Sequence, residues 1–430
     1  MHVSVVRISR SCEGSMKNQW SIYFIVCLFL FTAGGSVAAA QETVNLASLG
    51  GRVIDPQGAV VPGATVTVRQ TETNVAAEAI TDGEGRFRFP YLRVGPYEVR
   101  VRLAGFAAAT QALTLTVGSA FDLPFTLSVG GIDANVTVTG AATVLEAARS
   151  QIAGTISQAE VRSVPLNGRN FLDLALLIPG VSPTNVGSTQ LFAETSAVPG
   201  PGISVGSQRN FSNSFIVDGL SANDDAAGLS GIPYGVDAID QFQVVTSGGQ
   251  AELGRALGGY INVVTKSGTN VPRGDLYGYF RDDDFNSENA LSGAKLPMNQ
   301  KQYGASIGGP LRRDRTFFFS NVEQRKLDQT GLVTIPQDTI DTINARLSAT
   351  GYPGATLSTG IYRNPVDSTN LLGKIDHQVN GHDQLGLRYS LYRVSSSNSR
   401  GAGGTSAPSA SAALDNTDQA IAFSNTLTLS

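Results

Sequence analysis

The stretch "ALGGYINVVTKSGTN", Ala256 to Asn270, holds a short strand pattern between a glycine pair and a polar turn. Successive side chains alternate between two faces, as in a β-strand. One face would carry Ile261, Val263 and Thr265, and the other Asn262, Val264 and Lys266. The glycines before the strand, Gly258 and Gly259, allow a second piece of backbone to approach closely. The stretch therefore predicts a strand packed tightly inside a β-rich protein.

The composition favours an all-β fold. The chain has 430 residues, of which 41% are hydrophobic, only 15% are charged and 48 are glycine. Glycine weakens helices and suits turns and bulges, and much of the chain alternates valine and threonine. A length of 430 residues leaves room for two or three domains. The formal net charge of −4 gives no electrostatic footprint for nucleic acid.

The N-terminus has the pattern of a cleavable secretory signal over residues 1–40. Arg7, Arg10 and Lys17 precede the apolar run "SIYFIVCLFLF", and the small-residue stretch "SVAAAQE" follows it. The apolar run is too short for a spanning helix, and Ala40 precedes the expected cleavage point. The start could be Met1 or Met16, because "MKNQW" is also a normal signal beginning.

Both cysteines, Cys12 and Cys27, lie in this removable segment. The exported chain would then have none, which excludes a disulfide framework, a thiol nucleophile and cysteine metal sites. No later segment is apolar enough to predict a membrane helix. We expect an exported β protein without cysteine chemistry.

Residues 45–130 predict a small antiparallel sandwich. Short strands such as "PGATVTVRQ" and "GPYEVRVRL" are separated by turns, among them a tight turn at Asp82 and Gly83. The segments "GRVIDPQGAVVPGATVTV", "TDGEGRFRFPYLRVGPYEVRVRLAGF" and "LPFTLSVGG" resemble the carboxypeptidase regulatory-like domain, a transthyretin-like sandwich that is not a peptidase. Some relatives of this fold bind carbohydrate, and that function stays open here.

Residues 146–270 predict a mixed α+β region. "AEVRSVPLNGRNFLDLALLIPG" indicates a short amphipathic helix, Pro165, an asparagine turn and a second helix that ends at Pro179. Residues 181–206 are rich in Gly, Ser, Pro and Thr and predict a loop. "NSFIVDGL" predicts a strand, Phe215 to Val217, that runs into an Asp-Gly turn.

Three motifs of this region resemble the plug domain of TonB-dependent outer-membrane receptors of the Oar-like kind, which also carry an N-terminal regulatory-like domain. The motifs are "SVPLNGRNFLDLALLIPGV", "NSFIVDGL" and "AIDQFQVVTSGGQAELGRALGGYINVVTKSGTN". The resemblance implies that the plug fills a barrel and that Ala256 to Asn270 is its last strand before the barrel. The residues carrying the motifs are Asn167, Gly168, Arg169, Asn170, Asp218, Gly219, Gly258, Gly259, Asn262 and Thr265.

Residues 131–145 form a joint between the two regions and contain "VTVTG". This run resembles the TonB box, by which such receptors pair with the energy-coupling protein through strand addition. A plain linker or a last strand of the sandwich explains the same run equally well. The residues concerned are Val136, Thr137, Val138, Thr139 and Gly140.

Residues 271–430 predict the first strands of a membrane β-barrel. Six segments, from "GDLYGYFRDDDF" to "QAIAFSNTLTLS", alternate in a period of two and carry aromatic residues. A plugged transporter barrel has about 22 strands, and an open edge leaves backbone groups unpaired in lipid. We therefore expect an incomplete barrel, the N-terminal portion of a longer receptor.

An enzyme is not indicated. "GISVG", Gly202 to Gly206, matches G-x-S-x-G and has Asp376, His377 and His382 downstream, but a nucleophile elbow needs a strand, a sharp turn and a helix. Ser204 lies instead in the predicted loop. The two histidines lack a third ligand and are read as turn and strand residues.

The acidic run Asp282 to Asp284 is expected to end a strand at a solvated loop, with cation contact a minor option. No catalytic, cofactor or metal residue is assigned, and no cofactor is implied.

The resemblance implies TonB-dependent uptake across the outer membrane, with the sandwich on the periplasmic side. The partners would be a TonB-like coupling protein, outer-membrane lipid and an unknown substrate, for which an oligosaccharide or a peptide is a candidate, and not nucleic acid. The alternative is a cell-surface module that binds carbohydrate or protein without transport.

Overall fold

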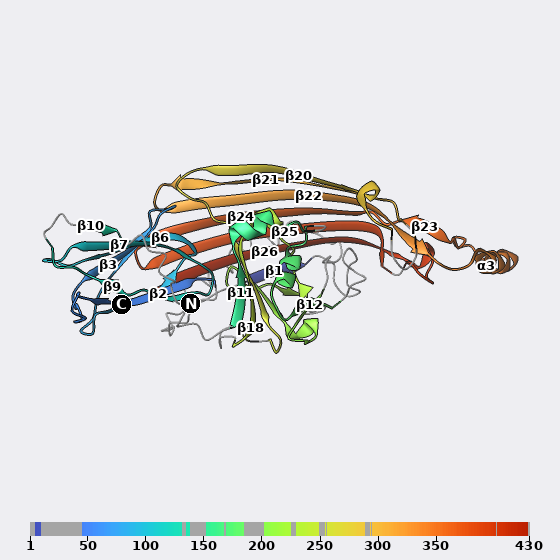
Figure 1. The fold of residues 1–430 in the computed structure, drawn as a ribbon. Coiled ribbons are helices and arrows are strands. Elements are labelled where there is room, and N and C mark those ends of the chain that lie inside the picture. Colours follow the sequence, from blue (N-terminus) through green and yellow to red (C-terminus); the bar gives the residue numbers. More distant parts are fainter. Residues whose placement is uncertain are drawn as a thin grey trace.

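The computed structural model describes residues 5–9, 45–130, 135–137, 152–166, 169–184, 202–224, 229–248, 254, 256–288, 293, 295–400 and 402–428. Strands dominate this part of the chain, as predicted, and they form three main bodies (Figure 1). We call residues 45–130 together with 135–137 the sandwich, residues 152–265 the plug and residues 273–427 the barrel sheet. The plug lies against one face of the barrel sheet, and the sandwich lies at one end of it.

The sandwich is built from two sheets around an apolar core. One sheet has the order β10-β7-β6-β3-β4 and the other contains β5, β2, β8 and β9. The strands are β2 (Ala47–Ile54), β3 (Thr65–Gln70), β4 (Ala76–Ile80), β5 (Arg86–Leu92), β6 (Gly95–Arg102), β7 (Ala108–Leu115), β8 (Ala120–Asp122), β9 (Phe125–Thr126) and β10 (Asn135–Thr137). Val66 and Val68 are fully buried, as their alternation predicts.

The predicted turn at Asp82 is confirmed. Its Oδ1 accepts hydrogen bonds from the backbone N–H groups of Glu84 and Arg86, at 2.9 and 2.8 Å. The Asp82 carboxylate thus stabilises the turn.

The plug contains a five-stranded mixed sheet in the order β11-β18-β19-β14-β15. Its strands are β11 (Ile152–Ile156), β14 (Ser214–Val217), β15 (Leu220–Ser221), β18 (Ile239–Ser247) and β19 (Tyr260–Thr265). β19 pairs antiparallel with β18 and parallel with β14, so it is a central strand. Short strand pairs lie beside this sheet: β12 (Val181–Pro183) with β13 (Ile203–Val205), and β16 (Asn223–Asp224) with β17 (Leu229–Ser230).

Two short helices precede the loop region, as predicted. α2 (Gln158–Ser163) begins with a capping box, in which Ser157 and Glu160 bond each other's backbone N–H. The second, η1 (Phe171–Leu177), is a 3₁₀ helix that begins at the Asn170 cap. Single 3₁₀ turns follow in the plug, η3 (Asn210–Ser212) and η4 (Val236–Ala238).

One sequence expectation about the plug was wrong. The stretch 181–206 is not entirely loop, because β12 and β13 pair across it and bury Ile203 and Val205. The strand of the opening stretch, β19, is tightly packed, as predicted: Ile261 and Val263 are at most 1% exposed, and Asn262 is fully buried as well. A central strand covered on both faces has no solvent side.

The barrel sheet is an antiparallel meander, and the six strands predicted from alternation are confirmed. They are β20 (Arg273–Asp282), β21 (Met298–Arg312), β22 (Thr316–Val333), β24 (Val366–Asn380), β25 (Asp383–Arg400) and β26 (Ala412–Leu427). Two further elements lie at one end of this open sheet: β23 (Gly360–Arg363), which pairs with β22, and the helix α3 (Gln337–Ala349) (Figure 1). The turns η6 (Asp283–Phe285) and η7 (Pro408–Ala410) lie beyond strand ends.

The two faces of the barrel sheet differ in chemistry. Leu276 and Phe280 on β20 are 88% and 79% exposed, and Leu387 on β25 is 45% exposed. The opposite face turns toward the plug and buries polar groups such as Asn321 and Arg388. Apolar side chains outward and polar ones inward are the pattern of a membrane barrel wall.

Val5–Ser9 forms strand β1, which pairs antiparallel with β26 at the edge of the barrel sheet. These residues fall in the segment 1–40, for which the sequence predicts a signal. In the described part of the chain, none of the helices is both long and apolar enough to cross a membrane.

Candidate functional site

The Asp-Gly motif forms the tight turn between β14 and β15. Asp218 and Gly219 both have positive φ, 48° and 80°. Two successive residues with positive φ are typical of the turn that best matches the twist of a two-stranded hairpin. The turn places the Asp218 carboxylate at the end of β14, beside the end of the parallel neighbour β19.

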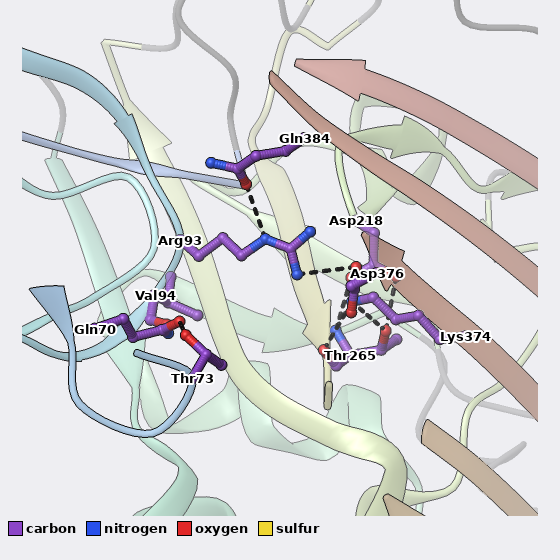
Figure 2. Close-up of polar contacts among 9 residues, drawn as sticks. All are labelled: Gln70, Thr73, Arg93, Val94, Asp218, Thr265, Lys374, Asp376 and Gln384. Atoms are coloured by element: carbon purple, nitrogen blue, oxygen red, sulfur yellow. Dashed lines mark hydrogen bonds and ion pairs between the residues drawn. The ribbon is translucent and has the colours of Figure 1, made fainter. Parts of the chain in front are cut away.

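Asp218 joins the plug to the barrel sheet. Its carboxylate accepts hydrogen bonds from the Thr265 N–H at 2.8 Å and the Thr265 hydroxyl at 2.7 Å, both at the end of β19. It also meets the Arg388 guanidinium of β25 at 2.7 Å and the Lys374 ammonium of β24 at 3.4 Å (Figure 2 draws Lys374 and Thr265 around it). We call these four residues the Asp218 cluster.

The Asp218 cluster is buried and strongly electrostatic. The side chains of Asp218, Lys374 and Arg388 are only 13%, 11% and 8% exposed. Burial alone would raise the pKa of Asp218, but the two cations and the Thr265 donors outweigh it and lower the pKa to about 2. The carboxylate is therefore charged at neutral pH, and two barrel strands depend on it for their counter-ion.

A second contact between plug and barrel comes from the "NGRN" motif. Arg169 has a φ of 52° and pairs with Asp237 at 2.6 Å inside the plug. Its guanidinium also lies over the ring of Tyr279 on β20, 3.7 Å from the centroid, which is a cation–π contact. Asn170 caps η1 by accepting the Leu172 N–H, and Asn167 and Gly168 lie outside the described residues.

The glycine pair ahead of β19 has the close contacts predicted for it. A Cβ at Gly259 would lie 2.6 Å from the Val205 side chain and 2.7 Å from the Val245 carbonyl. A Cβ at Gly258 would lie 2.6 Å from Asn213. Larger residues at either position would push β19 away from β13 and β18.

The loop after β7 attaches the sandwich to the plug. The Val117 N–H donates to Gln241 Oε1, and Gln243 Nε2 donates to the Val117 carbonyl, both at 2.7 Å. Both glutamines belong to β18 and are buried. A Cβ at Gly118 would reach Gln243 at 3.0 Å, so this loop sits directly on the plug sheet.

The sandwich is also attached to the barrel sheet. Arg93 pairs with Asp376 of β24 at 3.0 Å and donates to Gln384 of β25 at 2.9 Å (Figure 2). The loop that carries Arg93 is held by Gln70, which donates to the Val94 carbonyl at 2.9 Å. Because Lys374 and Asp376 are two residues apart on β24, they share a face, one bonding the plug and the other the sandwich.

A cavity of about 950 Å³ lies where the sandwich, the plug and the barrel sheet meet. It is bordered by the Asp218 cluster and by Arg93, Asp376, Asp240 and Lys266. Acidic and basic groups alternate around it, so the wall does not select for one sign of charge. The arrangement can hold three bodies together through ion pairs and can release them when those pairs break.

The predicted coupling run is only partly described. Asn135–Thr137, which includes Val136 and Thr137, forms strand β10 and pairs parallel with Ala108–Thr110 of β7. Val138, Thr139 and Gly140 lie outside the described residues. The start of the run is thus a strand at the edge of the sandwich, and whether it is also a coupling segment stays a prediction.

The residues weighed for catalysis are spread over unrelated places. Ser204 lies in the middle of β13 and is 8% exposed, which is not the strand-to-helix turn of a nucleophile elbow. His377 meets the Thr316 hydroxyl at 2.8 Å on adjacent strands, and His382 lies in the turn between β24 and β25.

The acidic run ends β20, as expected. Asp282 accepts the Asp284 N–H, and Asp283 accepts the Met298 N–H, both at 3.1 Å. These carboxylates thus shape the turn between β20 and β21.

Sequence reasoning missed the partners of Asp218 and of Val117. Lys374 and Arg388 follow Asp218 by more than 150 positions, and nothing in their local sequence marks them as plug contacts. The one usable signal is a charged residue on the inward side of a strand with an apolar outer side, as at Arg388 between Leu387 and Tyr389. Arg93 and the two glutamines carried no comparable signal.

Two parts of the chain match models of known protein families. Residues 48–128 match the family model of the carboxypeptidase regulatory-like domain, and residues 264–367 match that of an outer membrane beta barrel domain. The TonB-dependent transporter Oar of Myxococcus xanthus is 27% identical over 305 residues. That alignment covers 66% of this chain and 27% of Oar, so the chain spans about a quarter of that relative's length.

The solved structures that match this chain include those of a siderophore receptor and of an outer membrane transporter. The siderophore receptor PirA from Acinetobacter baumannii has a TM-score of 0.41 at 18% identity, over 59% of this chain and 33% of that one. The outer membrane transporter YddB from Escherichia coli has a TM-score of 0.46 at 16% identity, over 65% and 37%.

The sequence matches support an outer-membrane location. Over the part that it spans, the chain is similar to TonB-dependent outer-membrane transporters of the Oar kind, with an N-terminal carboxypeptidase regulatory-like domain.

Proposed function

We propose that the chain belongs to a TonB-dependent outer-membrane receptor that takes up a substrate, with an oligosaccharide or a peptide as the candidate class. Energy would come from a TonB-like coupling protein in the inner membrane, so the chain itself would need no cofactor. The observation that carries the proposal is the Asp218 cluster, because it ties a plug-like sheet to the inward face of a barrel sheet.

The barrel sheet supports contact with lipid. Its outward side chains include Leu276, Phe280 and Ile421, which are 88%, 79% and 51% exposed. Such side chains gain free energy when lipid covers them. The sandwich lies at the opposite end of the sheet from α3 (Figure 1), and its place ahead of the plug in the chain supports a periplasmic position.

The Asp218 cluster suggests how the plug is held closed. Moving β14 away from the barrel sheet would separate one buried carboxylate from two buried cations. Breaking such an arrangement costs several kcal/mol unless water enters as it opens. We infer that a pull on the chain opens the path by rearranging the plug and hydrating this cluster, and that the cluster re-forms when the pull ends.

The proposed handle for that pull is Val136–Gly140, which we call the coupling segment. An extended segment offers backbone N–H and C=O groups to an edge strand of the coupling protein. Its position between the sandwich and the plug lets a pull reach both. The same-length replacement of this segment by Gly-Ser-Gly-Ser-Gly should abolish coupling, because glycine disfavours the extended strand.

The test measures binding of the periplasmic domain of the host's own TonB-like protein to outer-membrane vesicles that carry the full-length protein. The replacement at 136–140 should reduce binding at least tenfold. The matched control is the same replacement at 141–145, which should leave binding within a factor of two. Equal binding by the unchanged protein and both variants would contradict this coupling segment, and an absence of binding to the unchanged protein would contradict TonB dependence.

A further inference from the structure

The turn between β3 and β4 of the sandwich, residues 71–74, reaches the end of the barrel sheet. Glu72 pairs with Arg273 at the start of β20, and the two charged groups are 2.9 Å apart. Asn74 donates from its Nδ2 to Asp314 Oδ1 at 3.0 Å, and Asp314 lies in the turn between β21 and β22. This turn of the sandwich therefore contacts the ends of three barrel strands.

The loop between β5 and β6 reaches the next two barrel strands. Arg93 pairs with Asp376 near the end of β24 and donates to Gln384 near the start of β25 (Figure 2). The two loops together span the barrel strands from β20 to β25. They contact these strands at the end of the sheet opposite α3 (Figure 1).

Gln70 holds the two loops together as one unit. Its Nε2 donates to the Val94 carbonyl at 2.9 Å, and its Oε1 accepts the Thr73 hydroxyl at 2.6 Å (Figure 2). Gln70 and Thr73 are both buried. Gly95 has a φ of 128°, and a Cβ there would lie 2.9 Å from Gln70 Nε2. One buried amide thus bridges both loops, and we call residues 70–74 and 93–95 the clamp.

The clamp borders the cavity of about 950 Å³ from the sandwich side. Gln70, Glu72 and Arg93 of the clamp line this cavity, and Lys374 and Asp376 line it from the barrel sheet. The cavity therefore lies between the plug and the clamp. A clamp that left the barrel strands would open the cavity on its sandwich side.

The clamp and the contact with the plug depend on different kinds of bond. The clamp contains two ion pairs, in which the side chains of Glu72 and Arg93 are 34% and 27% exposed. The contact with the plug consists of uncharged hydrogen bonds between Val117 and the buried Gln241 and Gln243. Ion pairs that water and salt can reach are weak. We therefore expect the clamp to open before the contact at Val117 does, which makes the loop after β7 a hinge.

We propose that the sandwich is a hinged cover on the cavity, which the clamp holds shut and which turns about the Val117 loop when the two ion pairs break. The sandwich stays folded as it turns, because its core consists of its own residues. In the proposed receptor, this cover is a second gate behind the plug. That role rests on the proposed function, whereas the movement itself does not.

The test measures the distance between the sandwich and the barrel sheet by pulsed electron spin resonance on the full-length protein in lipid nanodiscs. One spin label is attached at Gln57→Cys, in an exposed turn of the sandwich, and the other at Arg313→Cys, in the exposed turn between β21 and β22. The background carries serine at positions 12 and 27, so that the labels attach only at these two sites.

The clamp variant is Glu72→Gln with Arg93→Gln, which removes both ion pairs. The matched control is Glu84→Gln with Arg86→Gln, which removes an exposed ion pair inside the sandwich, with a length of 3.1 Å. We expect one short distance for the unchanged protein and for the control. The clamp variant should add a longer distance, with a population at least about fivefold larger than in the control.

A reciprocal variant removes the same two ion pairs from the barrel side, by Arg273→Gln with Asp376→Asn, and leaves the sandwich sequence unchanged. It should give the same longer distance. A longer distance for the first variant alone would mean that its substitutions disturb the sandwich itself. An unchanged distance for both variants would mean that the ion pairs do not hold the sandwich. Either result would overturn the inference.

A labelling experiment tests whether the movement opens the cavity. Val264 lines the cavity from β19, where it lies opposite Gln241 of β18, and it is buried. A membrane-impermeant maleimide should react with Val264→Cys at least about fivefold faster in either clamp variant than in the control. A longer distance without faster labelling would mean that the sandwich does not cover the cavity, which would overturn the inference. Neither measurement involves the coupling protein, so each can fail while binding at 136–140 succeeds.

Discussion

The sandwich and the plug bury their apolar side chains in different ways. The sandwich core is formed entirely by its own residues, from Ala47 on β2 to Leu127 after β9. The plug core continues into the barrel sheet, where Phe319, Leu372 and Val394 belong to the same cluster as Phe242. A domain whose core contains only its own residues can fold alone, whereas a domain whose core includes residues of a neighbour needs that neighbour to fold. The sandwich is therefore an independent body and the plug is an insert.

The buried polar groups of the two regions differ in the same way: the sandwich example bonds within its own domain, whereas the plug example bonds to the barrel sheet. In the sandwich, the Thr81 hydroxyl accepts the Ala64 N–H and donates to the Val61 carbonyl, both at 2.8 Å and both within the domain. In the plug, Asp218 takes its counter-ions from β24 and β25. The plug is held by ion pairs to the barrel sheet, and moving the plug relative to that sheet would break them.

The largest expected effect comes from separating the two regions. Residues 45–130 expressed alone should fold and unfold cooperatively, because their core is closed. Residues 146–270 alone should lack cooperative unfolding, because they lose the barrel part of their core and leave Asp218 without its cations. Near-UV circular dichroism during thermal unfolding measures both. A cooperative transition for the isolated plug would contradict the conclusion that the plug needs the barrel sheet to complete its core.

The next effect concerns the Asp218 cluster. Asp218→Asn keeps the shape of the side chain but leaves Lys374 and Arg388 buried without a counter-ion, so it should lower the free energy of unfolding by about 3 to 5 kcal/mol. Denaturant unfolding in detergent micelles, followed by Tyr fluorescence, measures the change.

The control for Asp218→Asn is Asp328→Asn, which breaks an exposed pair with Arg363 of the same length, 2.7 Å. Both partners of that pair are more than half exposed, so its loss should cost less than about 1 kcal/mol. Equal effects of the two variants would mean that the Asp218 cluster does not hold the plug.

A smaller effect is expected where the sandwich meets the plug. Gln243→Ala leaves the Val117 carbonyl without its donor and should weaken docking of the sandwich by about 1 to 3 kcal/mol. Faster hydrogen–deuterium exchange of the loop at residues 116–119 measures it, while exchange in β3 and β6 should stay unchanged. Faster exchange throughout the sandwich would mean that the domain is not independent of the plug.

The smallest effect is a pH dependence of the plug. Burial raises the pKa of Asp240 to about 6, although Lys374 and Lys266 nearby oppose the increase. The folded state then binds a proton between about pH 6 and pH 4 that the unfolded state does not, so stability rises as the pH falls. Between pH 7 and pH 5 this gain is about 1 kcal/mol.

Asp240→Asn should remove this part of the pH dependence, as measured by unfolding in detergent at pH 7 and pH 5. The isolated sandwich lacks Asp240 and provides the control. An identical pH dependence of the unchanged protein and the variant would show that Asp240 does not take up the proton.

Much of the fold could be predicted from local pattern. The strands of the sandwich and of the barrel sheet alternate at a period of two. The Asp-Gly turn has a backbone geometry that few other residues adopt, and the glycine pair leaves no room for a Cβ. The plug was harder, because β12 and β13 are three residues long and pair across about twenty residues of chain. Short strands leave too few alternating positions to distinguish them from loop.

The features of the site also differ in whether local sequence predicts them. The turn at Asp218 and Gly219, the tight packing of β19 and the outer and inner sides of the barrel strands could be predicted, because each follows from neighbouring residues. The contacts of Asp218 with Lys374 and Arg388, of Arg93 with Asp376 and of β10 with β7 became known from the folded structure. All of these contacts join residues far apart in the chain, the first two across different bodies, and their energies depend on burial and distance, which local sequence does not encode.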